Sequence, residues 1–193
     1  MRRSFSPRAL LMTAMLTTGL ASTAHAAKIP VISVTGTGTY NNSVSLLTDG
    51  SKPADATDWA GATNVWWYGT EPTFTLQFNS VYTVNQLLIQ VDNNDDYRID
   101  YSLNGSDWFL LDTIPSGIGS VGWGMETFNR TSTDFTPVDA RYLRVYATGG
   151  DNMYSISEVQ AFGAAAVPEP GTLALFGTGL LVSRFFRKRE ELL

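Results

Sequence analysis

The chain contains no cysteine, and its single histidine is His25. Without cysteine it has no disulfide bonds, so core packing, with or without a bound metal ion, must hold the protein together. The residues after His25 also lack the side chains needed for Ser-His-Asp or Cys-His catalysis and the usual ligands of zinc. The chemistry that remains is carboxylate catalysis, calcium held by oxygen atoms, or binding without catalysis.

Basic residues are scarce in the central part of the chain. Residues 28–166 contain six Lys and Arg against 15 Asp and Glu, which gives a formal charge of −9. Binding to phosphate groups requires clustered Lys and Arg, so we expect no nucleic acid partner.

The N-terminal segment has the pattern of a secretory signal peptide. Three arginines precede an apolar stretch at residues 9–21, and Ala24-His25-Ala26 supplies small residues for cleavage. The alternative is a membrane anchor, but the stretch is shorter than the roughly 20 apolar residues that span a bilayer. We therefore expect residues 1–26 to be a signal peptide and the protein to be exported.

Residues 27–164 are long enough for one domain, and their pattern predicts an all-β fold. Apolar and polar residues alternate in "TFTLQF" at 73–78, in "VNQLLIQVD" at 84–92 and in "YRIDYSL" at 97–103, as in half-buried strands. Asn104-Gly105 predicts a hairpin after the last of these.

Three further strands are predicted in the second half of the domain. They are "METFNRTSTDF", "RYLRVYAT" and "SISEVQAF", and a glycine-rich connection at 116–124 precedes the first. Strands at this spacing, rich in aromatic residues, favour a two-sheet sandwich or jelly roll with its loops gathered at the ends.

Three stretches resemble a known family. Residues 47–59, 97–111 and 135–163 together resemble the discoidin-type domain, also called the coagulation-factor C-terminal type, of the galactose-binding-like superfamily. The last stretch, with "ARYLRV" followed by "SEV", is the most specific. The resemblance covers about residues 46–163 and implies a jelly-roll β-sandwich.

The same resemblance implies a structural calcium ion. Motif positions assign ligand oxygens to Asp49, Thr57 and Glu158, and Asp55 could replace or join Thr57 because this loop is longer than the common form. Calcium takes six to eight hard oxygen ligands. Backbone carbonyls would complete the shell, near Leu47, Lys52 and Ala161. The alternative is that Asp49-Gly50 is only a turn and Glu158 a solvated strand residue.

Aromatic residues supply candidate sugar contacts. Trp66, Trp67 and Tyr68 are consecutive, so in an extended segment they cannot all face one core, and at least one should be exposed. Exposed Trp rings can stack on sugar rings, and Trp123 in the glycine-rich connection is a similar candidate. The alternative is that the tryptophans belong to the core.

Polar candidates lie between two predicted strands. Asn94 and Asp95 stand in the "VDNNDD" segment, and Arg98 follows it and could bind a carboxylated sugar. Asn and Asp are also what a tight connection uses, and an arginine on a strand can simply face solvent or bridge the sheet. Both interpretations remain open at this point.

The C-terminal segment resembles a sorting signal. Val167-Pro168-Glu169-Pro170 precedes an apolar run at 171–182 and a basic cluster at 187–189. This ordered set resembles the PEP-CTERM signal of Gram-negative bacteria, which implies a short hydrophobic helix, transient anchoring in the inner membrane, and processing of residues 165–193 by an exosortase-type enzyme. A plain membrane anchor is the alternative.

Together these features predict an exported, non-catalytic protein of the cell surface or extracellular matrix. Its expected ligand is an extracellular polysaccharide or another glycan. A structural matrix protein that recognises no particular sugar is the main alternative, and a glycoside hydrolase that uses paired carboxylates is a third.

Overall fold

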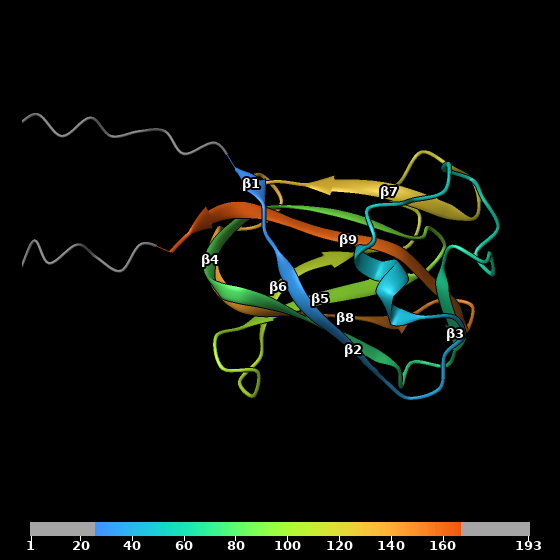
Figure 1. Ribbon diagram of the computed structural model, residues 1–193. Helices are drawn as coiled ribbons and strands as arrows, with labels where there is room; N and C mark the ends of the chain where they lie inside the picture. Colours follow the sequence, from blue (N-terminus) through green and yellow to red (C-terminus); the bar gives the residue numbers. More distant parts are fainter. Residues whose placement is uncertain (1–25, 167–193) are drawn as a thin grey trace, which may run out of the picture.

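Antiparallel strands and one short 3₁₀ helix form the part of the protein that the computed structural model describes, residues 26–166 (Figure 1). The expected signal peptide, sorting motif and hydrophobic helix lie outside these residues. Within residues 26–166 no helix is both long and apolar enough to cross a membrane. The elements are β1 (Ala27–Lys28), β2 (Val31–Thr37), η1 (Val44–Thr48), β3 (Val65–Tyr68), β4 (Thr73–Asp92), β5 (Asp96–Ser102), β6 (Phe109–Ile114), β7 (Met125–Arg130), β8 (Val138–Gly149) and β9 (Met153–Ala165).

Strand β4 belongs to both layers of a sandwich. Its first part, residues 73–78, pairs with β2 and β8, and this layer continues through β5 to β6. Its second part, residues 82–92, pairs with β9 and β7, and β9 also pairs with the short strands β1 and β3. The two layers therefore share one strand and face each other across the core (Figure 1).

The sequence predicts two strands where the structure has the single strand β4. The predicted segments 73–78 and 84–92 are its two halves, and the register with β8 shifts between Gln77 and Tyr82. The chain keeps an extended backbone across this bend and passes from one layer to the other. The alternation pattern identifies both halves, but it carries no signal for a strand that continues through a bend.

The core lies between the layers and uses the predicted alternating faces. Phe74, Leu76 and Phe78 from the first half of β4 are buried, as are Leu87, Ile89 and Val91 from the second half. Burial of each such side chain contributes about 1.5–3 kcal/mol. The all-β sandwich predicted from the sequence is confirmed.

The predicted hairpin is the β5–β6 pair, in which Tyr101 lies opposite Phe109. Its connection, residues 103–108, is longer than a two-residue turn, and side-chain hydrogen bonds order it. Ser102 Oγ accepts hydrogen bonds from the backbone N–H groups of Asn104 and Gly105 at 3.2 and 2.9 Å. Gly105 has φ +77°, a conformation that glycine adopts without strain.

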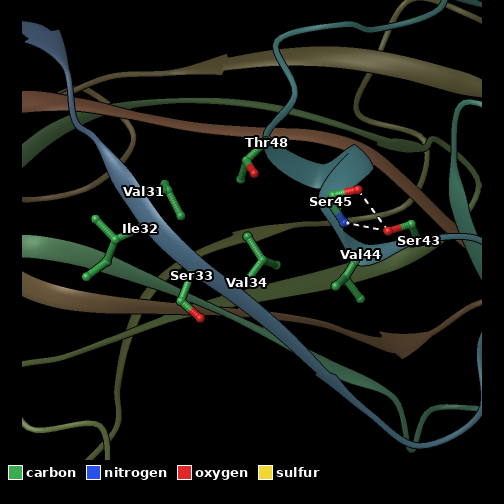
Figure 2. A pocket seen from close by; sticks show the side chains of 8 residues that line it. All are labelled: Val31, Ile32, Ser33, Val34, Ser43, Val44, Ser45 and Thr48. Atoms are coloured by element: carbon green, nitrogen blue, oxygen red, sulfur yellow. Dashed lines mark hydrogen bonds between the residues drawn. The ribbon is translucent and has the colours of Figure 1, made fainter.

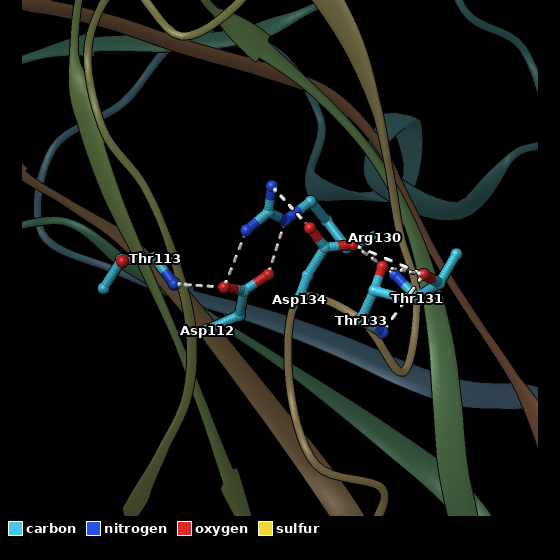
Figure 3. A network of polar contacts seen from close by, with 6 residues as sticks. All are labelled: Asp112, Thr113, Arg130, Thr131, Thr133 and Asp134. Atoms are coloured by element: carbon cyan, nitrogen blue, oxygen red, sulfur yellow. Dashed lines mark hydrogen bonds and ion pairs between the residues drawn. The ribbon is translucent and has the colours of Figure 1, made fainter.

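An arginine joins the two layers at one side of the sandwich. Arg130, at the end of β7, donates through Nε and Nη2 to both carboxylate oxygens of Asp112 on β6, at 2.7 and 3.1 Å (Figure 3). Its Nη1 lies 3.3 Å from Asp134 Oδ1. Paired, two-point contacts of this kind fix geometry as well as charge.

Candidate functional site

Four loops meet at the end of the sandwich where β4 finishes (Figure 1). We call this the loop end; its loops are residues 54–64, 92–96, 115–124 and 149–152. Backbone bonds join the loops to one another: Met125 N–H donates to Thr57 O at 2.9 Å, and Asn93 N–H donates to Gly124 O at 3.1 Å. These backbone hydrogen bonds hold the loops side by side, so that the loops form one continuous surface.

The loop between β8 and β9 is fixed to the loop between β4 and β5. Asp151 N–H donates to Asp95 Oδ1 at 3.1 Å, and Asn94 Nδ2 donates to Asp151 Oδ2 at 2.9 Å. Gly150 has φ +137°, and a Cβ there would overlap the Asp95 carboxylate. The predicted ligand residues Asn94 and Asp95 are therefore both at the loop end, Asn94 exposed and Asp95 buried.

Three aromatic rings pack against one another beside these loops. Trp59, Trp66 and Tyr68 form the aromatic cluster, with edge-to-face ring contacts whose centroids lie 5.4–5.9 Å apart. Tyr68 is 57% exposed, and Gly69 N–H donates to Asn152 O, which links the cluster to the 149–152 loop. The cluster thus presents aromatic surface to solvent at the loop end.

Trp67 does not share this exposed position. Strand β3 pairs with β9, so successive side chains point to opposite faces, and Trp67 is 0% exposed. Its ring packs against Phe74, Tyr97 and Tyr154 in the core. The expectation that Trp67 contacts a ligand is corrected on this ground: the residue is part of the core.

Trp123 stands on the 115–124 loop and is 63% exposed. The buried carboxylate of Glu126 holds this loop, because Ser120 donates to it through both its backbone N–H and its hydroxyl. Asn93 adds a side-chain bond to Val121 O. Glu126 and Asn93 therefore fix the loop that carries Trp123 against the loop that follows β4.

Two buried aspartates at the loop end have strongly raised pKa values. Burial, reinforced by the nearby charge of Asp151, raises the pKa of Asp92 to about 6. Burial raises the pKa of Asp95 to about 7, and the charges of Asp92 and Asp151 add to this effect. Like charges that crowd together in a desolvated place disfavour ionisation.

Arg98 is engaged in a different network. Its Nε donates to Asp100 Oδ1 at 2.6 Å, and Arg144 Nη2 donates to the other oxygen of the same carboxylate at 2.7 Å. Arg144 also stacks over the Trp108 ring at 4.4 Å. Arg98 therefore belongs to a network that bridges β5 and β8, which is one of the two interpretations that the sequence left open. Its guanidinium group pairs with Asp100 and not with the predicted ligand residues at the loop end.

The residues expected to hold calcium separate into two groups. Asp49 and Glu158 lie together: Gly50 N–H donates to Glu158 Oε2 at 3.1 Å, and Lys28 Nζ lies 3.8 Å from Glu158 Oε1. Burial raises the pKa of Glu158, and the charge of Asp49 contributes to the increase. This pair has the hard oxygens that calcium takes, linking the first loop to the last strand.

Asp55 and Thr57 belong to another hydrogen-bonded set. Asp55 Oδ1 accepts bonds from Gln90 Nε2 at 3.0 Å and from Thr127 Oγ1 at 2.7 Å, and Thr57 donates to Ala54 O. Burial alone would raise the pKa of Asp55, but the bonds from Thr127 and Gln90 outweigh it and hold the pKa below its usual value. Across residues 26–166, no three His, Cys, Asp or Glu side chains group closely enough to hold a metal.

A hollow of about 260 Å³ lies elsewhere, between β2 and η1 (Figure 2). Its lining is aliphatic and hydroxylic, without an aromatic ring or a charge, and Ser43 caps η1 through a bond to Ser45 N–H at 3.3 Å. A sugar site needs aromatic surface with polar groups around it, which favours the loop end. The lining residues are Val31, Ile32, Ser33, Val34, Ser43, Val44, Ser45 and Thr48.

Several residues that shape the loop end carry little signal in the sequence. Trp59 is half-buried in the aromatic cluster. Asp58, on the 54–64 loop, contributes through its charge to the raised pKa of Asp92. A polar residue at the end of an apolar strand, as Asp92 is after Val91, is the one signal in the sequence. The proximity of the Asp58 charge depends on tertiary structure.

Family comparisons match two separate parts of the chain. The model of the F5/8 type C domain matches residues 28–159, and that of the PEP-CTERM protein-sorting motif matches residues 166–189. None of the curated proteins compared matches the chain.

Solved structures of similar fold include two sugar complexes. One is the CBM32 of AlyQ in complex with 4,5-unsaturated mannuronic acid, with a TM-score of 0.53, 19% identity, and coverage of 72% of this chain and 99% of that one. The other is CpGH89CBM32-5 from Clostridium perfringens in complex with GalNAc-β-1,3-galactose, with a TM-score of 0.51, 15% identity, and coverage of 71% and 100%. At these identities the similarity establishes the fold.

Proposed function

Because the chain belongs to the F5/8 type C domain family over residues 28–159 and carries a PEP-CTERM protein-sorting motif, we propose that it is an exported, non-catalytic protein that binds carbohydrate at its loop end. The sorting motif supports delivery by an exosortase-type system to the envelope surface or matrix of a Gram-negative cell, with transient anchoring in the inner membrane. Exopolysaccharide made by the cell is then the glycan most available to it.

The observation that carries this proposal is the aromatic cluster beside a set of polar loop residues. Tyr68 and Trp123 are the most exposed aromatic residues there, and Asn94 and Asp151 supply hydrogen-bonding groups next to them. Aromatic faces with a few oriented polar groups are what sugar rings require. The two CBM32 structures named above, each solved with a sugar, support the same use of this fold.

The carboxylates at the loop end favour binding over hydrolysis. A glycosidase needs two carboxyl groups that reach the substrate across a separation of roughly 5–10 Å. A glycosidic bond cannot lie between Asp92 and Asp95, because both side chains are buried. The neighbours of known structure are carbohydrate-binding modules, which agrees with a non-catalytic role.

Calcium is a separate proposal for the Asp49–Glu158 pair. An ion bound there would supply no catalysis; it would join the loop after η1 to β9 and stabilise the folded state. The Lys28 ammonium is the group that such an ion would displace from the Glu158 carboxylate.

A glycan array with the full chain, run with calcium and again with chelator, tests the carbohydrate proposal. We expect selective binding that falls about tenfold in Tyr68→Ala and Trp66→Ala, because each removes stacking surface. Phe109→Ala is the matched control, since it removes an exposed aromatic at the opposite end of β5 and β6. A folded protein that binds no glycan in either condition would contradict the proposal.

A second candidate function is assembly of matrix without specific sugar recognition. Leu103, Phe109 and Leu110 are exposed at and beside β6, which within residues 26–166 pairs only with β5. An exposed apolar edge strand favours association between copies. Sedimentation velocity decides: concentration-dependent assembly that Phe109→Ala abolishes, without glycan binding, would favour this candidate.

A further inference from the structure

Four aspartates at the loop end have no basic partner. Asp58, Asp92, Asp95 and Asp151 form what we call the acidic group. The ion pairs found among residues 26–166 engage Glu158, Asp100, Asp112 and Asp134, and none includes a member of the acidic group. Arg98, the basic residue nearest along the chain to Asp92 and Asp95, is held by Asp100.

One atom of this group lacks any partner. Asp92 is 2% exposed, and within the described part of the chain its Oδ1 receives no hydrogen bond. Buried polar atoms are almost always paired, so an unpaired carboxylate oxygen points to a partner supplied from outside the chain. Asp58 and Asp151 both lie close enough to Asp92 to disfavour its ionisation.

The exposed members of the group are positioned beside the aromatic cluster. Asp58 precedes Trp59, and its Oδ1 accepts a bond from Ala60 N–H at 2.8 Å. Asp151 is oriented by Asn94 Nδ2 and by Met153 N–H, each at 2.9 Å. A sugar that stacks on the aromatic cluster would therefore have oriented carboxylates at its edge.

We infer that the loop end selects glycans that carry free ammonium groups, as de-N-acetylated amino sugars do, and rejects uronic acids. This inference rests on the proposed function of glycan binding. An ammonium group is a hydrogen-bond donor with positive charge, so it pairs with the exposed carboxylate of Asp58 or Asp151. A uronate carboxylate would meet like charge there, since the loops at 54–64, 92–96, 115–124 and 149–152 contain Asp but no Lys or Arg.

Calorimetry with three hexasaccharides tests this selection. The full chain is titrated at pH 6 in low salt with β-1,4-linked hexamers of glucosamine, N-acetylglucosamine and mannuronate. We expect the glucosamine hexamer to bind at least about tenfold more tightly than its acetylated form, no binding of the mannuronate hexamer, and loss of the preference in high salt.

Charge-neutralising variants locate the effect. Asp58→Asn and Asp151→Asn should each reduce the glucosamine preference by about threefold. Asp107→Asn, in the exposed connection at the other end of β5, should leave it unchanged. Thermal unfolding of each variant shows that the fold is retained.

The possible outcomes separate the two proposals. Equal or tighter binding of the acetylated or mannuronate hexamer overturns the charge selection and leaves glycan binding in place. Absence of binding to all three, and to the array described above, overturns glycan binding itself. A glucosamine preference that Asp107→Asn reduces as much as Asp151→Asn reflects net protein charge and overturns the assignment to the loop end.

Discussion

Neighbouring residues on β3 have opposite roles because a strand alternates its faces. Trp67 is surrounded by Phe74, Tyr97 and Tyr154 in the core, whereas Tyr68 projects to solvent next to Trp66 and Trp59. The same chemical type of residue therefore stabilises the fold at one position and offers binding surface at the next.

Substitutions at these two positions should separate stability from binding. Trp67→Ala should lower the free energy of unfolding by about 4 kcal/mol, because it leaves a cavity in the core. Tyr68→Ala should change the free energy of unfolding by less than about 1 kcal/mol and weaken glycan binding. Urea unfolding and glycan titration of both variants check this, and equal loss of stability in the two would contradict the assigned positions.

Asp92 is a residue whose charge opposes folding. Its pKa is about 6 in the folded protein and 3.8 in an unfolded chain, so the folded state binds its proton more tightly. Below about pH 4 the group is neutral in both states and costs nothing. As pH rises from about 4 through 6, the folded state must ionise a buried carboxyl and stability falls.

Asp92→Asn should therefore stabilise the protein in a pH-dependent way. We expect a gain of about 3 kcal/mol at pH 8 and less than about 1 kcal/mol at pH 4, because a shift in pKa from 3.8 to about 6 corresponds to about 3 kcal/mol. Denaturant unfolding at the two pH values measures it, with Asp107→Asn as the exposed control. A gain that is the same at both pH values would show that charge is not its cause.

At the scale of elements, a glycine determines whether the Trp123 loop can close on the sandwich. A Cβ at Gly119 would overlap the Glu126 carboxylate, which holds this loop through Ser120. A Cβ at Gly122, three residues along the same loop, would meet nothing within 4 Å. The chain thus offers two glycines with opposite tolerance a short distance apart.

Gly119→Ala should release the loop, and Gly122→Ala should not. We expect chymotrypsin to cleave after Trp123 about tenfold faster in Gly119→Ala, since a weaker attachment raises the population of the open loop. The global unfolding midpoint should change little, because the core is untouched. Equal cleavage rates in the two variants would mean that Glu126 does not control the loop.

At the scale of the whole molecule, the loop end and the two ends of the described residues, 26 and 166, lie at opposite ends of the sandwich. Strand β9 begins at Met153, beside the loop end, and runs for 13 residues to Ala165, a length of about 40 Å. Ala27 pairs with Gly163, so both ends of the described chain leave from the far side (Figure 1). A tail that attaches the protein to an envelope would therefore leave the candidate binding surface facing outward.

Calcium, if it binds between Asp49 and Glu158, should stabilise the whole domain. The ion would join the loop after η1 to the last strand, and at 100 times its dissociation constant it would add about 2.7 kcal/mol to the free energy of unfolding. We expect calcium to raise the melting temperature of the wild type, and chelator or Glu158→Gln to remove the increase, whereas magnesium should have little effect. An unchanged melting temperature in calcium would contradict the site.

Alternation and turn residues in the sequence alone determined the all-β sandwich, the hairpin after Tyr101 and the buried faces of β4. These follow from local rules, because a period of two assigns each side chain to one side of a strand. The same rules required that Trp66, Trp67 and Tyr68 not share a face. They gave no basis for choosing which of the three would be buried.

That choice, and the composition of the loop end, were decided only by tertiary structure. Trp67 faces the core because β3 pairs with β9 in a register that places Trp67 opposite Tyr154. The charge of Asp58 acts on Asp92, and Asp151 N–H donates to Asp95, because the 54–64 loop and the ends of β4, β5, β8 and β9 lie at the same side of the sandwich. Contacts between residues more than 30 positions apart depend on strand pairing and not on local pattern, and those contacts concentrate unpaired negative charge at the loop end.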